Sequence, residues 1–251
     1  MTNDLLLLST SHLHGHAFLE HAIDAVASFL DGCTTVHFAP YAIADHDGYT
    51  ERIRTTLEPL GVRVIGLHTL RSPRAAVARA EVLYVGGGNT FRLLKAVQSL
   101  GLVGPVRRRV GAGELRYLGS SAGTNHACPT VRTTNDMPIV EPRSLAAFGL
   151  VPFQINPHYL DADPASTHMG ETREQRIEQF LEENDVPVLG LREGAWLRRR
   201  GQTLRLCGTA GARLFRRGRT AVEYEPGKDL SFLLRSEPKF DSPAARGRRR
   251  A

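Results

Sequence analysis

The stretch EVLYVGGGNTFRLLKAVQSL, residues 81–100, joins three local patterns in one continuous segment. Glu81–Val85 is a short, mostly apolar run with the length of a buried strand. Three glycines follow, and apolar residues then recur at helical spacing over Phe91–Leu100. A strand that passes through a tight turn into a helix predicts a βα unit of a parallel sheet.

The same order of strand and helix extends along the chain on both sides of this unit. The other predicted strands are Leu5–Ser9, Thr34–Ala39, Val62–Leu67 and Arg116–Gly119. The other predicted helices are His16–Leu30, Tyr49–Leu60 and Ala75–Ala80. This alternation predicts right-handed βαβ crossovers and a mainly parallel α/β sheet with helices on both faces.

The pattern changes after Thr130, where short strands with tight connections replace the alternation. Residues 186–191, 195–199 and 203–206 are short strand-like runs separated by REG and RGQ. Such spacing is typical of antiparallel hairpins, which we expect to close the sheet toward its C-terminal edge.

The positive charge of the chain is concentrated at its C-terminal end. The net charge is +6, and residues 239–251 alone contribute +4 through five basic residues and one acid. We expect a single α/β domain over residues 1–235 and a basic, disordered tail over residues 236–251. Because the rest of the chain is nearly neutral, nucleic-acid binding is not expected as its main function.

The first apolar run and the cysteines indicate in which cellular compartment the protein is expected. Leu5–Leu8 is too short for a signal sequence or a membrane span. The three cysteines are widely separated and form no C-x-x-C pair, which argues against a disulfide framework or a zinc site. We therefore expect a cytoplasmic protein that does not bind membranes, and a homodimer is compatible with the sequence.

Residues 118–130, LGSSAGTNHACPT, contain a candidate nucleophile. The pattern G-x-S-x-G, typical of a nucleophile elbow between a strand and a helix, fits only one register, from Gly119 to Gly123. That register selects Ser121, because Ser120 would need glycines at positions 118 and 122. The backbone N–H of Ala122 would then donate to an oxyanion at the start of the following helix.

The glycine turn at residues 86–88 offers a second oxyanion donor, from Gly87 or Gly88. The turn lacks the lysine of a phosphate-binding P-loop, so phosphate binding is the weaker interpretation.

A serine nucleophile needs a base and an acid that orients the base. His158 lies in FQINPHYLD, where an apolar strand ends, and is the preferred base. Two acids are candidates: Glu193 in the turn REG, and Asp136 in RTTNDMP. The histidines in HLHGH, residues 12–16, lie between a strand and a helix, and no metal site is expected there.

Seven longer stretches of the chain carry a more specific signal. They are LLLLS, VGGGNTFRLLK, GSSAGTN, ACPTVRTTNDMPIVEP, FQINPHYLD, GETREQRIEQFL and GLREGAW. With them, between residues 5 and 200, the chain resembles peptidase E, the α-aspartyl dipeptidase family of serine peptidases.

The resemblance implies a flavodoxin-like α/β fold, akin to class I glutamine amidotransferase domains, and hydrolysis of dipeptides with N-terminal aspartate without a cofactor. It also implies a triad of Ser121, His158 and Glu193, with Asp136 as an alternative relay acid. Arg192 stands where family members often have proline.

A substrate carboxylate calls for arginine, which can bind it through two parallel hydrogen bonds. ETREQRIEQFL predicts a helix that begins at a capping box of Thr172 and Gln175. The resemblance assigns the carboxylate contact to Arg173, and Arg132 is a second candidate. Arg176 is better explained as an exposed residue in helical ion pairs.

Three other functions are compatible with the elbow: cyanophycinase-like cleavage of β-Asp-Arg links, hydrolysis of small esters, and ligand binding without catalysis. The stretches RTTNDMPIV and GETREQRI favour the dipeptidase over the cyanophycinase-like activity.

Overall fold

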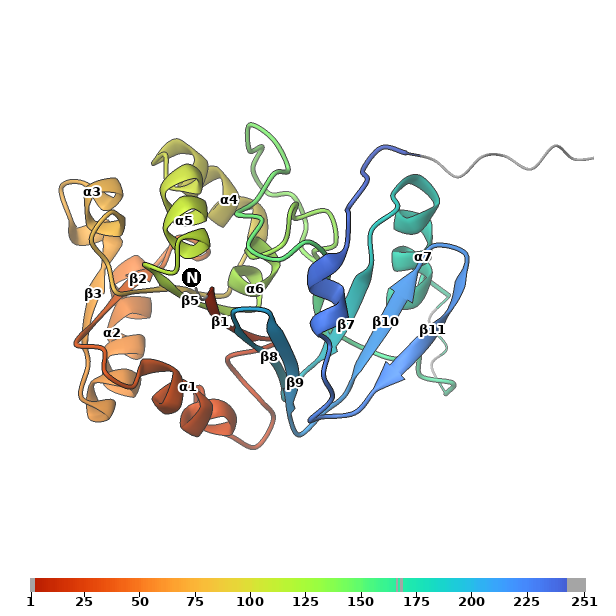
Figure 1. The fold of residues 1–251 in the computed structure, drawn as a ribbon, viewed down its shortest axis with the longest axis horizontal. Coiled ribbons are helices and arrows are strands. Elements are labelled where there is room, and N and C mark those ends of the chain that lie inside the picture. The colour runs from red at the N-terminus through yellow and green to blue at the C-terminus, as the bar shows by residue number, and fades with distance from the viewer. Residues whose placement is uncertain (1–2, 166, 168, 243–251) are drawn as a thin grey trace, which may run out of the picture.

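In the computed structural model, which describes residues 3–165, 167 and 169–242, a seven-stranded sheet organises most of the chain. Its strand order is β3-β2-β4-β5-β1-β8-β9 (Figure 1). The parallel strands are β1 Asp4–Leu8, β2 Thr35–Ala39, β3 Arg63–Gly66, β4 Val82–Val85 and β5 Arg116–Ser120. An antiparallel hairpin, β8 Ala195–Arg200 and β9 Thr203–Gly208, extends one edge. The predicted mainly parallel α/β sheet is confirmed.

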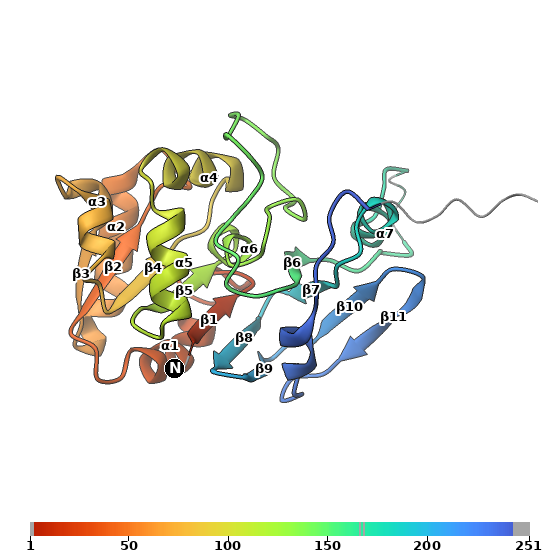
Figure 2. The ribbon, with the colours of Figure 1, turned by 45° about the horizontal axis from the view of Figure 1, so that its top comes forward.

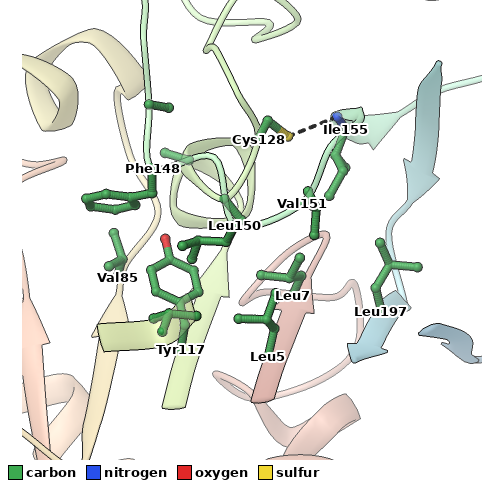
Figure 3. Packing of buried hydrophobic residues seen from close by; sticks show 14 of the residues in the cluster. Leu5, Leu7, Val85, Tyr117, Cys128, Phe148, Leu150, Val151, Ile155 and Leu197 are labelled. Atoms are coloured by element: carbon green, nitrogen blue, oxygen red, sulfur yellow. Dashed lines mark hydrogen bonds between the residues drawn. The ribbon is translucent and has the colours of Figure 1, made fainter. Parts of the chain in front are cut away.

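Helices cover both faces of this sheet because successive side chains of its strands point to opposite, equally apolar sides. Leu6 and Leu8 of β1 share a buried cluster with α1 and α2, whereas Leu5 and Leu7 belong to the cluster on the opposite face (Figure 3). The helices are α1 Ile23–Leu30 and α2 His46–Leu57 on one face, and α3 Pro73–Val77, α4 Thr90–Ser99, α5 Val103–Gly111 and α6 Ala122–His126 on the other.

A second, four-stranded sheet in the order β11-β10-β7-β6 lies beside the first (Figure 2). Its strands are β6 Gln154–Tyr159, β7 Val188–Arg192, β10 Ala212–Arg216 and β11 Arg219–Tyr224. Helix α7, Arg173–Glu183, buries Ile177 and Leu181 against it. This corrects one expectation: β7 does not join the edge of the first sheet but pairs with β6 and β10, where its Val188 packs in one cluster with Ile177 and Leu181 of α7.

Two helical segments differ from the prediction. The first helix begins later than residue 16, with a 3-10 turn at Glu20–Ala22 after Leu19, whose φ is +61°. Helix α5 was not predicted, because Gly104, Pro105 and Gly111 give its sequence the composition of a loop. The remaining 3-10 turns are Glu58–Leu60, Leu67–Thr69 and Ser231–Arg235.

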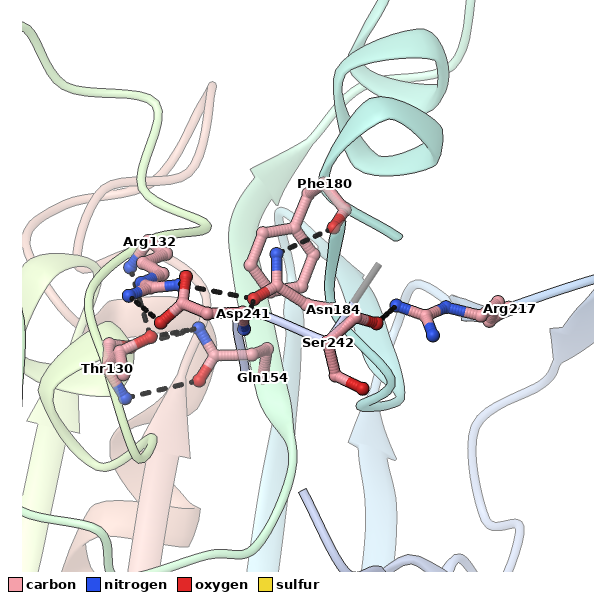
Figure 4. A network of polar contacts seen from close by, with 8 residues as sticks. All are labelled: Thr130, Arg132, Gln154, Phe180, Asn184, Arg217, Asp241 and Ser242. Atoms are coloured by element: carbon pink, nitrogen blue, oxygen red, sulfur yellow. Dashed lines mark hydrogen bonds and ion pairs between the residues drawn. The ribbon is translucent and has the colours of Figure 1, made fainter. Parts of the chain in front are cut away.

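The end of the described chain lies against the second sheet and its helix. Lys239 forms an isolated β-bridge with Asp185, and Asp241 accepts two hydrogen bonds from Arg132, at 2.7 and 2.9 Å (Figure 4). Residues 236–242 of the expected tail are therefore held to the body, and residues 243–251 lie outside the described residues. In the described parts, no helix has the length and apolar character that crossing a membrane requires.

Candidate active site

Ser121 lies between β5 and α6 in a backbone conformation that residues with a side chain rarely adopt, with φ +52° and ψ −111°. Two glycines make this turn sterically possible. A Cβ on Gly119 would lie 2.8 Å from the backbone of Gly123, and a Cβ on Gly123 would overlap the carbonyl oxygen of Val85. The N–H of Ser121 donates to the carbonyl oxygen of Leu8 at 3.1 Å. The turn thus holds Ser121 at the carboxyl end of the parallel strands.

Ser120 points into the protein instead. Its side chain is 0% exposed, and its Oγ lies 3.2 Å from the hydroxyl oxygen of Tyr84. Ser121, by contrast, lines a cavity of about 350 Å³. The two adjacent serines therefore differ in both burial and direction, and Ser121 is the one available to a ligand.

His158 bridges the two other members of the predicted triad. Its Nε2 lies 2.8 Å from Oγ of Ser121, and its Nδ1 lies 2.6 Å from Oε1 of Glu193. The side chains of His158 and Glu193 are partly exposed. Serine, imidazole and carboxylate thus form one continuous hydrogen-bonded chain, the arrangement that activates a serine for attack.

A local irregularity in β6 directs the imidazole toward the elbow. The pairing of β6 with β7 shifts register between Pro157 and Tyr159, and His158 has φ +53°. The N–H of His158 donates to Oγ of Ser9 at 2.9 Å, and that hydroxyl donates to the carbonyl oxygen of Leu191 at 2.8 Å. Ser9 follows β1, so one hydroxyl ties the first sheet to both β6 and β7.

Arg192 stands where members of the family that the sequence resembles often have proline. In this structure it anchors the turn that carries Glu193. Its guanidinium contacts the carboxylates of Asp161 at 2.7 and 2.8 Å and of Glu223 at 2.9 and 3.1 Å. Hydrogen bonds to these two acids raise the pKa of Arg192. The arginine thus links the turn to β11 and to the chain after β6.

Asp136 lies elsewhere. Its Oδ2 accepts the N–H of Thr90, the first residue of α4, at 2.7 Å. A carboxylate at this position also interacts favourably with the helix dipole. The structure thus brings Ser121, His158 and Glu193 together and places Asp136 at a helix N-terminus.

The three candidate oxyanion donors differ in their hydrogen bonding. The N–H of Gly87 donates to the hydroxyl of Tyr49 at 2.9 Å. Within the described part of the chain, the N–H groups of Gly88 and Ala122 have no hydrogen-bond acceptor. A Cβ on Gly87 would lie 3.0 Å from Cβ of Ser121, so the glycine turn passes directly beside the serine.

The cavity beside Ser121 also contains residues that the sequence patterns did not single out. Its walls are Thr10, Ser11, His12, Ile43, Tyr49, Arg52, Gly87, Gly88, Ser121, His158 and Glu193. Arg52 comes from the exposed side of α2, where a cation gives no sequence signal. His12 belongs to the histidine-rich segment, and no group of three or more His, Cys, Asp or Glu side chains among the described residues is placed to hold a metal ion.

The predicted capping box is confirmed, and it begins α7 at Arg173. The Thr172 hydroxyl accepts the Gln175 N–H, and the Gln175 side chain accepts the Thr172 N–H. Arg173 is half-buried; burial and the nearby Arg176 lower its pKa, whereas the charge of Asp136 raises it. The guanidinium of Arg173 is therefore within electrostatic reach of the carboxylate at the start of α4.

The other two arginines, Arg132 and Arg176, already pair with carboxylates of the protein. Arg132 binds Asp241 and also donates to Oδ1 of Asn184 at 3.1 Å, beneath the C-terminal segment (Figure 4). Hydrogen bonding to Asp241 raises the pKa of Arg132. Arg176 is exposed, with its Nε 3.8 Å from a carboxylate oxygen of Glu171. None of the three arginines, Arg173 included, lines the cavity that contains Ser121.

Comparison with known proteins shows the family to which the chain belongs. The family model described as Peptidase family S51 matches residues 5–207. The chain belongs to peptidase family S51. It is 56% identical over 239 residues to "Peptidase E" of Streptomyces coelicolor, covering 95% of this chain and 98% of the relative. It is 47% identical over 233 residues to "Probable alpha-aspartyl dipeptidase" of Drosophila melanogaster, covering 92% and 97%.

A solved structure of a peptidase from an acI-B1 Actinobacterium shares the fold of this S51 chain. It aligns with a TM-score of 0.68 at 16% identity, over 92% of this chain and 98% of that one. The resemblance inferred from the sequence motifs is confirmed at the level of the family, and the protein is a serine-type peptidase.

Proposed function

We propose that this S51 peptidase hydrolyses dipeptides with N-terminal aspartate, and that Ser121, His158 and Glu193 carry out the reaction. The observation that carries the proposal is the pair of hydrogen bonds that joins these three side chains at the wall of a cavity. The name of the relative from Drosophila, "Probable alpha-aspartyl dipeptidase", supports the substrate class.

The reaction begins when His158 Nε2 accepts the proton of Ser121 as Oγ attacks the carbonyl carbon between aspartate and the next residue. Glu193 holds the imidazole by its Nδ1–H and stabilises the positive charge that the ring acquires. The protonated imidazole then donates to the leaving amine. A water molecule, deprotonated by the same imidazole, hydrolyses the aspartyl ester and restores Ser121.

The negative charge on the carbonyl oxygen is stabilised by the N–H groups of Ala122 and Gly88. Both are without an acceptor in the described chain, and Ala122 begins a helix, where N–H groups are unpaired and the dipole favours negative charge. Gly87 is the weaker candidate because its N–H is engaged by Tyr49, whose hydroxyl pins the glycine turn beside Ser121.

Arg173 binds the side-chain carboxylate of the substrate's aspartate. Arg132 and Arg176 already have carboxylate partners, whereas the described residues offer the guanidinium of Arg173 none within hydrogen-bonding distance. Its half-buried position would strengthen a charge-assisted bond to a substrate carboxylate.

The test is hydrolysis of Asp-Leu, Leu-Leu, β-Asp-Arg and p-nitrophenyl acetate by the wild type, Ser121→Ala and Ser120→Ala. We expect the wild type to prefer Asp-Leu, Ser121→Ala to be inactive, and Ser120→Ala to keep most of the activity. Faster hydrolysis of β-Asp-Arg would indicate a cyanophycinase-like enzyme instead. Loss of activity in Ser120→Ala alone would overturn the assignment of the nucleophile.

A further inference from the structure

Arg52 brings a guanidinium to the cavity that contains Ser121, from a helix that the proposed reaction does not use. Its side chain makes no hydrogen bond or ion pair with the described residues. Its positive charge affects the pKa of two other residues that line the cavity, His12 and Tyr49. Burial lowers the pKa of His12 and Arg52 lowers it further, whereas burial raises the pKa of Tyr49 to about 12 against the opposing effect of Arg52.

Arg52 lines the cavity that contains Ser121, whereas Arg173, at the start of α7, does not. Arg52 belongs to α2, which packs on the face that contains Leu6 and Leu8. Arg173 is within electrostatic reach of Asp136, which binds the start of α4 on the other face. Ser121, at the end of a central strand, lies between these two sides.

An aspartyl dipeptide also carries two carboxylates, one on each side of the bond to be broken. The side-chain carboxylate belongs to the acyl half, and the free α-carboxylate belongs to the leaving half. His158, which delivers a proton to the leaving amine, and Glu193, which orients it, line the same cavity as Arg52. A leaving residue that lies against His158 would share this cavity with Arg52.

We propose that Arg52 binds the free α-carboxylate of the leaving residue, so that the enzyme recognises both ends of a dipeptide. This inference rests on the proposed function. In a longer peptide the terminal carboxylate would move away by about 3.5 Å for each added residue, and an amide would replace it beside Arg52. The interaction would therefore favour dipeptides over longer peptides.

The experiment measures kcat and KM for Asp-Leu and Asp-leucinamide, which differ only in the carboxylate. The proteins are the wild type, Arg52→Gln, Arg52→Lys and the control Arg54→Gln, whose arginine lies on the same helix but pairs with Glu51 and Glu58. We expect Arg52→Gln to lower kcat/KM for Asp-Leu by about 10- to 100-fold, mainly through KM, and to leave Asp-leucinamide unchanged. Arg52→Lys should restore part of the loss, and Arg54→Gln should behave as the wild type.

Equal losses on both substrates in Arg52→Gln would contradict the inference, because Arg52 would then act on the acyl half or on the fold. No loss on either substrate would contradict it as well. In both cases an active wild type would leave the proposed function standing. A wild type inactive toward Asp-Leu would instead overturn the proposed function, and the inference with it.

Discussion

The Nε2 atom of His158 lies 2.8 Å from Oγ of Ser121, although the two residues belong to different sheets. Ser121 follows β5 of the seven-stranded sheet, and His158 lies in β6 of the four-stranded sheet. Ser9 joins the two by accepting the N–H of His158 and donating to Leu191. The site therefore depends on the junction of the sheets as much as on the elbow.

Replacing Glu193 should affect catalysis far more than replacing Asp136. In Glu193→Gln the imidazole loses the carboxylate that fixes its tautomer, so kcat for Asp-Leu should fall by roughly 10²–10⁴-fold. Asp136→Asn keeps a hydrogen-bond acceptor for the N–H of Thr90 and should reduce kcat much less. Steady-state kinetics of both variants show which of the two acids orients His158. A larger fall of kcat in Asp136→Asn than in Glu193→Gln would make Asp136 the relay acid.

Gly123→Ala should prevent the elbow from forming, because the added Cβ overlaps the carbonyl oxygen of Val85. We expect a loss of activity and a free energy of unfolding lower by about 1–3 kcal/mol, as for other overpacked sites. Gly111→Ala is the control, since a Cβ there meets open space at the end of α5. Urea unfolding should show that this control is unchanged or slightly more stable, and equal destabilisation by both would refute the steric argument.

Arg173→Gln and Arg132→Gln should separate substrate recognition from structural support. Loss of the charge at position 173 should lower kcat/KM for Asp-Leu by roughly 10²-fold and leave Leu-Leu unaffected. Arg132→Gln loses its contacts with Asp241 and Asn184 and should reduce stability without changing the preference for aspartate. A loss of the preference for aspartate in Arg132→Gln but not in Arg173→Gln would show that Arg132, and not Arg173, binds the substrate carboxylate.

His126 should make the protein less stable in mild acid. Burial lowers the pKa of His126 from 6.5 to about 4, although hydrogen bonding to the carbonyl oxygen of Ala122 opposes this. Between these values the unfolded chain binds a proton that the folded protein does not. The free energy of unfolding should therefore fall as the pH drops from 6.5 to 4, with a contribution on the order of 3 kcal/mol from this residue.

Denaturant unfolding at several pH values, followed by the fluorescence of Trp196, measures this effect. His126→Gln should show a smaller loss of stability between pH 6.5 and 4 than the wild type. The exposed His14 supplies the control, and His14→Gln should keep the wild-type pH dependence. An unchanged pH dependence in His126→Gln would mean that this histidine does not resist protonation in the fold.

Local features of the sequence were enough to predict much of the site. The glycines around Ser121 are required by contacts within a few residues of the turn and by one neighbouring strand, so their spacing alone identified the serine that faces the cavity. The capping box of Thr172 and Gln175 is likewise local, and it correctly placed Arg173 at the start of a helix. Such patterns can be recognised in the sequence because the contacts that require them are made mostly between residues close together in the chain.

Features that depend on distant packing could not be predicted in the same way. The partner of β7 is decided by β6 and α7, and no local pattern distinguishes it from a strand at the edge of the first sheet. Arg52 is one of many exposed basic residues, and it becomes part of the site only because α2 packs beside the glycine turn. The choice between Glu193 and Asp136 also required the positions of elements far apart in sequence.

The most direct test of the account compares kcat/KM of the wild type for Asp-Leu and for Asn-Leu. The two substrates have nearly the same shape and differ in the charge that Arg173 is proposed to bind. The account predicts that Asp-Leu is preferred by roughly 10²-fold or more, because the amide leaves a half-buried guanidinium without an anionic partner. Equal values for the two substrates would contradict recognition of the N-terminal aspartate by charge.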